Sequence, residues 1–257
     1  MKKFETYHGD CLDLMPLMIE DASVDLILCD LPYGTTACAW DSVIPFAALW
    51  AEYRRVLKPL GAVVLTAAQP FTTAVIAANA TEFRYCWYWK KSRVTGFANA
   101  KKQPLRCVED VVVFYRKPPT YNPQGLILFG KTVNKGKSAG GVTVQGEQIG
   151  NSKGALRSGA DYVQEFTGYP RQVLEIPSEA KTVHPTQKPV ALMEYLIRTY
   201  TNEGDTVLDN CMGSGTTGVA CANTGRNFVG IERDDKYYAL AHERIAAAYD
   251  AQLEALV

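Results

Sequence analysis

The sequence has few of the residues and patterns that mark several large classes of protein. It contains only three histidines, widely separated, and its seven cysteines form no Cys-X-X-Cys pair. A metal site therefore has little support, and we expect none. The chain also has no run of 18 apolar residues, and Met1-Lys2-Lys3 leads into Glu5 without a signal-like apolar segment. These absences argue against a membrane partner and predict a soluble, cytoplasmic protein.

The chain also has no net charge, because 27 basic residues balance 27 acidic ones. The charge is nevertheless uneven along the chain. The segment 84–157 has 14 basic residues against three acidic ones, which leaves 13 basic and 24 acidic residues elsewhere. Such asymmetry is typical of a protein that binds a polyanion on one face. A solvated basic loop is the alternative interpretation.

Apolar and amphipathic stretches alternate along most of the 257 residues, of which 47% are hydrophobic, enough for one substantial core. Strands are expected at 4–7, 24–28, 62–65, 84–89, 108–115, 205–209 and 228–232, and helices at 11–19, 45–57, 71–79, 189–201, from 219 onward and at 237–253. This order predicts an α/β fold, with a doubly wound, mostly parallel sheet and helices on both faces. The segment 118–183 has few apolar periods, but islands such as Leu126–Phe129 indicate a small ordered module or one that orders on binding.

A carboxylate, a proline and an aromatic ring follow the second expected strand, in the hexapeptide CDLPYG at residues 29–34. The strand is apolar throughout and is expected to be buried in a parallel sheet, and ligands bind at the C-terminal ends of such strands. Asp30 and the Leu31 carbonyl can both accept hydrogen bonds from one amino group, and Tyr33 offers a ring on which a planar base can stack. An ordinary Asp-X-Pro turn with a surface tyrosine is the alternative.

A glycine-rich turn joins the expected strand 205–209 to the next helix. It contains Gly213, Gly215 and Gly218 in the spacing G-x-G-x-x-G, and Glu232 ends the following strand. Glycines allow close approach of the backbone to a ligand, and the acid can accept from ribose hydroxyls, so the pattern indicates a cofactor that contains adenosine. The spacing does not separate nicotinamide from other adenosyl cofactors. A turn needed only for tight helix–strand packing is the alternative.

The position of this turn constrains the topology of the sheet. After Glu232 only about 25 residues remain, enough for one helix. The half of the sheet that binds the cofactor therefore cannot be completed by later strands, as it is in a standard dehydrogenase. The missing strands must come from the N-terminus. We therefore expect the strand before Asp30 to lie beside the one that ends at Asp209, with both sites open along one edge. Asp10, at an earlier strand-to-helix junction, either caps the helix or touches the ligand.

Three motifs, taken together and in this order, resemble those of one family. Residues 30–33 (DLPY) resemble the Asp-Pro-Pro-Tyr catalytic motif of amino-directed DNA methyltransferases, and residues 209–217 resemble their S-adenosylmethionine motif. Residues 184–189 (HPTQKP) resemble the preceding element in the β class, in which the catalytic motif comes first. The resemblance implies a methyltransferase fold in circular order: a catalytic half in 1–116, an inserted target-recognition region in 117–182 and a cofactor-binding half in 183–257.

The resemblance also implies an activity. In this family aspartate in the catalytic motif goes with adenine, and often serine with cytosine, so Asp30 favours methyl transfer to N6 of an adenine flipped out of double-stranded DNA. The cofactor would be S-adenosylmethionine and the product S-adenosylhomocysteine. N4-cytosine or RNA base methylation would share nearly every motif; a nicotinamide oxidoreductase or a non-catalytic DNA-binding protein are more distant alternatives. A restriction-modification role in a bacterium, prophage or phage is implied; the resemblance permits a homodimer, and it permits a cognate endonuclease without requiring one.

The motifs assign roles to individual residues. The catalytic group is Asp30, Leu31, Pro32 and Tyr33. The cofactor group is Asp10, Cys11, Asp30, Thr186, Lys188, Asp209, Asn210, Cys211, Gly213, Ser214, Gly215, Thr216, Thr217, Glu232 and Arg233. The expected DNA contacts are Lys90, Lys91, Arg93, Lys101, Lys102 and Arg106, with the region 117–180 reading bases.

The chain departs from the family pattern at three places. Leu31 replaces the first proline of the catalytic motif, where the carbonyl is the contacting group, and Asn210-Cys211 replaces the commoner Pro-Phe. Val108-Glu109 stands where many relatives have His-Glu, so we assign no role there. Lys188 is either a helper at the site or a lysine whose stem lies along the helix entry while its amine reaches solvent.

Overall fold

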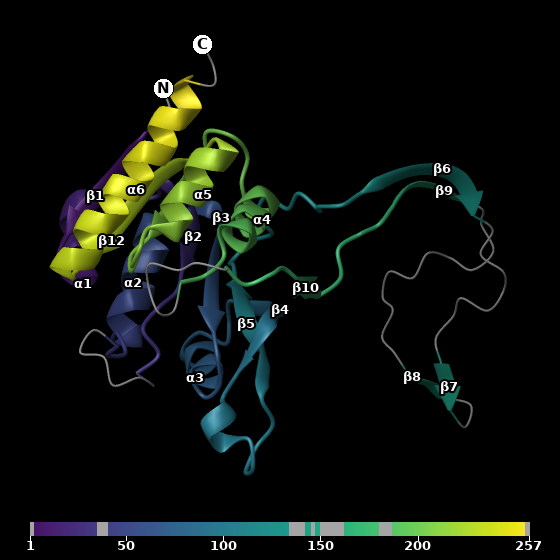
Figure 1. Cartoon of the computed structure of the whole chain (residues 1–257). Helices are drawn as coiled ribbons and strands as arrows, with labels where there is room; N and C mark the ends of the chain where they lie inside the picture. The colour runs from purple at the N-terminus through teal and green to yellow at the C-terminus, as the bar shows by residue number, and fades with distance from the viewer. Residues whose placement is uncertain are drawn as a thin grey trace. The chain divides into compact units, whose positions relative to one another are not determined.

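The computed structural model describes residues 3–34, 41–133, 142–144, 147–149, 162–179 and 187–254. The chain divides into two compact units, one made of Met1–Asn122 with Arg171–Val257 and the other of Pro123–Pro170 (Figure 1). The second unit is narrower than the inserted region expected at 117–182. The reason is that strand β10 (Val173–Glu175) pairs in parallel with β4 (Phe83–Thr95) and so belongs to the sheet of the larger unit.

The larger unit is built on an eight-stranded sheet in the order β1-β12-β11-β2-β3-β5-β4-β10. The remaining strands are β1 (Phe4–His8), β2 (Val24–Cys29), β3 (Leu57–Ala67), β5 (Arg106–Phe114), β11 (Thr206–Asp209) and β12 (Asn227–Glu232). Neighbouring strands are parallel except around β5, which is antiparallel to both β3 and β4. The predicted mostly parallel α/β sheet is therefore confirmed.

The strand order joins the N-terminal and C-terminal parts of the chain. Strand β11 pairs with β2, with Val207 opposite Leu26 and Leu208 opposite Ile27, and β1 pairs with β12 along five residues from Phe4 to His8. The N-terminal strands thus complete the cofactor half of the sheet, as the topology argument predicted. Because parallel strands share their direction, Asp30 after β2 and Asp209 at the end of β11 lie at the same edge.

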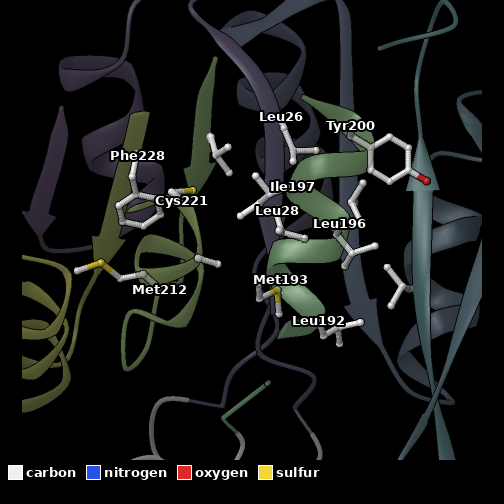
Figure 2. Close-up of a cluster of buried hydrophobic side chains, with 14 of the residues drawn as sticks. Leu26, Leu28, Leu192, Met193, Leu196, Ile197, Tyr200, Met212, Cys221 and Phe228 are labelled. Atoms are coloured by element: carbon white, nitrogen blue, oxygen red, sulfur yellow. The ribbon is translucent and has the colours of Figure 1, made fainter. Parts of the chain in front are cut away.

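Both faces of the sheet are buried, which explains the unbroken apolar runs of its central strands. In β2, Leu26 and Leu28 join one core cluster, while Ile27 and Cys29 join the other. The second cluster includes side chains from α1 (Cys11–Met18), α2 (Phe46–Val56) and α3 (Phe71–Ala78), and the first includes side chains from α4 (Val190–Tyr200), α5 (Thr216–Thr224) and α6 (Asp235–Glu254). Figure 2 shows Ile197 and Met193 of α4 beside Leu26 and Leu28 of β2, whereas Tyr200 points away from this strand.

Two elements differ from the sequence expectation. Strand β3 begins at Leu57 and includes the expected break at 58–61. Val24 of β2 pairs with Leu57 and Leu26 with Ala62, so residues 58–61 bulge out at this register shift. Strands β4 and β5 run past the expected ends to pair Thr95 with Arg106, so part of the polar, basic stretch forms a long hairpin that ends in a 3₁₀ turn at Phe97–Asn99.

The smaller unit contains two short antiparallel ladders. Strand β6 (Ile127–Val133) pairs with β9 (Tyr162–Thr167), and β7 (Val142–Val144) pairs with β8 (Glu147–Ile149). The apolar island at 126–129 falls mainly in β6, where Leu128 is 75% exposed. In the part of the chain that the structure describes, no helix combines the length and the apolar character that a membrane crossing requires.

Candidate active site

A cavity of about 610 Å³ opens in the larger unit, at the edge where the parallel strands end. It is lined by every described residue that the sequence assigned to catalysis or cofactor binding, except Gly215. Gly215 instead precedes α5 in a left-handed conformation (φ +79°), packed against Ala241 and Ile245 of α6. Thr186 lies outside the described residues. The strand topology has therefore collected residues from five separate sequence segments around one space.

The glycines of the turn have different surroundings. Gly213 has φ +51°, and no atom of the described residues lies within 4 Å of where a Cβ would stand, so the backbone there borders open space in the cavity wall. At Gly218 a Cβ would lie 2.5 Å from Cδ1 of Ile245 and 2.9 Å from Cε1 of Phe228. Gly218 is thus required for packing of α5 against α6 and β12, whereas Gly213 leaves room for a ligand.

The Glu232 carboxylate stands at the end of β12, held by backbone donors. Its Oε2 accepts from the Gly213 N–H at 2.8 Å, and its Oε1 accepts from the N–H groups of Arg233 and Asp234, both at 2.9 Å. These bonds orient the carboxylate where it lines the cavity. They also link the glycine turn after β11 to the end of β12.

The predicted capping role of Asp10 is confirmed by its hydrogen bond at the start of α1. Its Oδ1 accepts from the Leu12 N–H at 2.8 Å at the start of α1. The residue also lines the cavity. The two alternatives for Asp10 are therefore compatible, because one carboxylate oxygen caps the helix while the side chain remains at the cavity wall.

Asp209 and Asn210 are buried at the end of β11, at 3% and 2% exposure. The Cys211 N–H donates to Asp209 Oδ1 at 3.1 Å, and the Tyr53 hydroxyl donates to Asn210 Oδ1 at 2.7 Å. Burial raises the pKa of Asp209 to about 6, although hydrogen bonds from Thr217 and Cys29 act in the opposite direction. No pattern in the sequence pointed to Tyr53, a buried residue of α2 that orients Asn210 through this hydrogen bond.

The raised pKa of Asp209 predicts a pH dependence of stability. Its pKa lies near 6 in the folded chain against 3.8 as the ordinary value, so the folded state binds more protons between these values and the free energy of unfolding falls as pH rises through them. Asp209→Asn removes this titration. In urea unfolding, the stability of the variant relative to wild type should rise by about 2 kcal/mol from about pH 4.5 to 7.5. A difference that stays constant over this range contradicts the prediction.

The Asp30 carboxylate is held by three side-chain donors. The Tyr33 hydroxyl donates to Oδ1 at 2.7 Å, and Thr66 near the end of β3 also donates to Oδ1. The Lys188 amine donates to Oδ2 at 2.7 Å. The ring of Tyr33 stacks on Phe71 with centroids 4.9 Å apart, and burial together with the Asp30 charge raises the pKa of its hydroxyl. The alternative of an ordinary turn with a surface tyrosine is wrong.

Lys188 is a part of the site and its amine does not reach solvent. Its side chain is 7% exposed, and its Nζ lies 2.7 Å from Asp30 and 3.5 Å from Glu109 of β5. Burial lowers the pKa of Lys188, but the Asp30 and Glu109 carboxylates raise it by more, so its pKa lies above the usual value. The alternative of a lysine with a solvated amine at the helix entry is therefore wrong.

The sequence interpretation missed Glu109 and Thr66. Thr66 follows the strand-end rule and could have been found, because it stands one residue before the end of parallel strand β3. Glu109 could not be found in this way. Strand β5 runs antiparallel to its neighbours, so its N-terminal half, not its C-terminal end, reaches the edge that holds the site.

The basic residues expected to bind DNA fall into two groups. Lys91 is only 10% exposed and its amine lies 2.9 Å from Glu109; this burial and pairing correct its assignment as a phosphate contact. Lys90 is half-exposed and paired with Glu175 of β10 at 3.1 Å. The other four are exposed on the β4–β5 hairpin or at its end: Arg93, Lys101, Lys102 and Arg106. Within the described residues, no group of three or more His, Cys, Asp or Glu side chains is placed to hold a metal ion.

The sheet order and the cavity at its carboxyl edge define an S-adenosylmethionine-dependent methyltransferase fold. Residues 24–243 match the N6/N4 methyltransferase family model, described as DNA methylase. The chain belongs to this family, and its cofactor is S-adenosylmethionine. The open backbone at Gly213 and the oriented carboxylate of Glu232 fit a ligand with a ribose and an amino-acid end.

Individual relatives agree with the family match. The chain is 26% identical over 249 residues to type II methyltransferase M.HpaI of Haemophilus parainfluenzae, covering 90% of this chain and 71% of the relative. It is 28% identical over 246 residues to type II methyltransferase M1.MboII of Moraxella bovis, covering 89% and 91%.

Solved structures show the same fold. The M1.HpyAVI–SAM complex has a TM-score of 0.61 at 25% identity, with 94% of this chain and 99% of that one covered. The PvuII DNA methyltransferase, described as cytosine-N4-specific, has a TM-score of 0.68 at 17% identity, with 99% and 94% covered. At that identity the likeness to PvuII concerns the fold alone.

Proposed function

We propose that this protein transfers a methyl group from S-adenosylmethionine to the N6 amino group of an adenine in double-stranded DNA. The observation that carries the proposal is the Asp30 carboxylate, aimed into the cavity at the end of β2 and held by Tyr33, Thr66 and Lys188. Aspartate at this position of the motif favours adenine over cytosine. The type II relatives support a role in restriction-modification in the bacterial cytoplasm. This role permits a homodimer, and it permits a cognate endonuclease without requiring one.

The catalytic residues act by positioning. Asp30 and the carbonyl of Leu31 accept the two N–H groups of the target amine, which directs the nitrogen lone pair toward the methyl group. Tyr33, braced by Phe71, supports the flipped base. The bound cofactor supplies the methyl group already activated as a sulfonium. No covalent enzyme intermediate is needed, so orientation and charge placement are the protein's contribution.

The cofactor residues are assigned by their place along the cavity. Glu232 would accept from the ribose hydroxyls and Asp10 would lie near the adenine, while the turn from Gly213 to Thr217 would hold the methionine end. Arg233, Asn210 and the remaining cavity residues of this group complete the wall. The assignment follows the order in which the strand ends meet the cavity.

DNA is proposed to contact the exposed basic side chains of the β4–β5 hairpin, namely Arg93, Lys101, Lys102 and Arg106. Arg93 and Arg106 line the cavity rim, and the two lysines lie in the turn beyond the 3₁₀ segment. These side chains neutralise phosphates and carry no sequence information. The smaller unit, residues 123–170, is the proposed base-reading element.

The hairpin assignment makes a quantitative prediction about salt. The double variant Lys101→Ala, Lys102→Ala should bind DNA more weakly for all sequences, and the slope of log affinity against log salt should flatten by about one unit for each phosphate that a lysine no longer neutralises. Equilibrium binding over a salt series measures this slope. Lys3→Ala removes an exposed lysine at the other end of the sheet and serves as the matched control. An unchanged slope in the double variant would show that these lysines do not contact phosphate.

The proposed activity is tested by incubating the protein with unmethylated genomic DNA and labelled S-adenosylmethionine, followed by nucleoside analysis. Label recovered as N6-methyladenosine supports the proposal. Label on cytosine N4 would keep the family and overturn the choice of base. No transfer to DNA by protein that binds the cofactor would overturn the DNA substrate and direct the search to RNA.

A further inference from the structure

Four charged side chains of alternating sign form a row in the cavity wall. The Lys188 Nζ lies 2.7 Å from Asp30 Oδ2 and 3.5 Å from Glu109 Oε2, and the Lys91 Nζ lies 2.9 Å from Glu109 Oε1. The four residues come from the turn after β2, the segment before α4, β5 and β4. All four line the cavity. We name this row, Asp30–Lys188–Glu109–Lys91, the charge row.

We propose that Lys188 is a positioning residue for methyl transfer, which holds the Asp30 carboxylate charged and oriented, and that Glu109 and Lys91 hold Lys188 in place. The inference rests on the proposed function, because it concerns the carboxylate that receives the target amine. It adds no covalent step to the methyl transfer. It assigns roles to two residues, Glu109 and Lys91, that the family motifs leave without one.

The burial of the charge row argues that it serves the cavity. The exposed fractions of the side chains are 25% for Asp30, 7% for Lys188, 18% for Glu109 and 10% for Lys91. Desolvating charges is costly, and apolar residues of similar size often stabilise a fold as well or better. In addition, the buried Glu109 Oε2 makes no hydrogen bond within the described residues beyond its ion pair with Lys188 at 3.5 Å. Packing alone therefore gives a poor account of this arrangement.

The hydrogen bonds to Asp30 leave one acceptor position for a substrate. A carboxylate offers about four lone-pair sites. Among the residues that the structure describes, Oδ1 accepts from both Tyr33 and Thr66, while Oδ2 accepts from Lys188 only. The free site is thus on Oδ2, the oxygen that Lys188 holds. The direction from which a target amine can bind is accordingly set by the position of the lysine.

Lys188 also determines what kind of acceptor Asp30 is. A cation within hydrogen-bonding distance favours the ionised carboxylate and weakens it as a base. Asp30 therefore holds the amine as a charged acceptor, and the proton leaves to water after transfer. The titratable groups that face Asp30 are Tyr33 on its own turn, Lys188 and Glu109 in the charge row, and Cys29 and Asp209 of β2 and β11.

The test compares Lys188→Met with Lys188→Arg in single-turnover methylation of DNA across a pH series. Lys188→Met should slow transfer by about 10²-fold. Without the cation the ionised carboxylate loses its nearest stabilising charge, so the acid limb of the pH–rate profile, where activity falls on acidification, should begin at a higher pH than in wild type. Lys188→Arg keeps the positive charge, so the acid limb of this variant should lie at the same pH as in wild type, whatever the rate of transfer by the variant. Adding Glu109→Gln to Lys188→Met removes the neighbouring negative charge. The acid limb of the double variant should therefore lie at a lower pH than in Lys188→Met, between that variant and wild type.

Two results would overturn the inference. One is a Lys188→Met variant that transfers methyl more slowly but loses activity on acidification at the same pH as wild type. This result would leave the lysine a structural or cofactor-binding role. The other is an Lys188→Arg variant whose limb stays displaced. Wild type is measured in parallel, so failure of the proposed function is seen separately. Transfer to cytosine by wild type overturns only the choice of base, and the pH dependence is then measured on methylated cytosine. If wild type transfers nothing to DNA, both proposals are wrong.

Discussion

Asp30→Ala should lower methyl transfer to DNA by at least about 10³-fold, because the target amine loses its charged acceptor and its orientation toward the methyl group. The affinity for S-adenosylmethionine should change little, since the glycine turn and Glu232 stay intact. In the wild-type chain the carboxylate receives hydrogen bonds from Tyr33, Thr66 and Lys188. Single-turnover transfer of labelled methyl measures the rate, and calorimetry measures cofactor binding.

The matched control for this variant is Asp110→Ala. Asp110 is a half-buried carboxylate on β5 that accepts from Thr72 and does not line the cavity. Its removal tests the general effect of losing a partly buried acid near the same edge of the sheet, and it should leave transfer close to wild type. If Asp30→Ala retains transfer at a similar level, the assignment of Asp30 as the acceptor of the amine is wrong.

Glu232→Ala should raise the dissociation constant for S-adenosylmethionine by about 10²-fold, the equivalent of one or two charge-assisted hydrogen bonds to ribose hydroxyls. The loss has a second source. The N–H groups of Gly213, Arg233 and Asp234 lose their common acceptor, so the turn that borders the cofactor is less well ordered. Transfer at saturating cofactor should remain near the wild-type rate.

Glu232→Gln separates these two sources. The amide keeps one oxygen for the backbone donors but carries no charge, so its effect should lie between wild type and Glu232→Ala. Asp30→Ala and Glu232→Ala also control each other, because Asp30→Ala should lower transfer far more than cofactor affinity, and Glu232→Ala should lower cofactor affinity far more than transfer. A Glu232→Ala variant that binds the cofactor as tightly as wild type would remove this residue from the cofactor site.

The sequence by itself was informative wherever the chemistry follows a parallel strand. Asp30, Asp209 and Glu232 each stand at the end of a buried strand, and the alternation of strands and helices was enough to place them at one edge. The predicted pairing of β2 with β11 is also confirmed. These inferences succeeded because strand direction, chain length and burial are local properties that apolar patterns record.

The tertiary structure decided the electrostatics of the site. Glu109 reaches the cavity only because β5 reverses direction between β3 and β4, and no local pattern marks an antiparallel strand inside an otherwise parallel sheet. Lys91 was counted with the exposed basic residues, yet it is buried against Glu109. Lys188 is separated from Asp30 by 158 positions, and their ion pair depends on how α4 is entered. Charge partners are set by distances between elements, which one strand's composition does not contain.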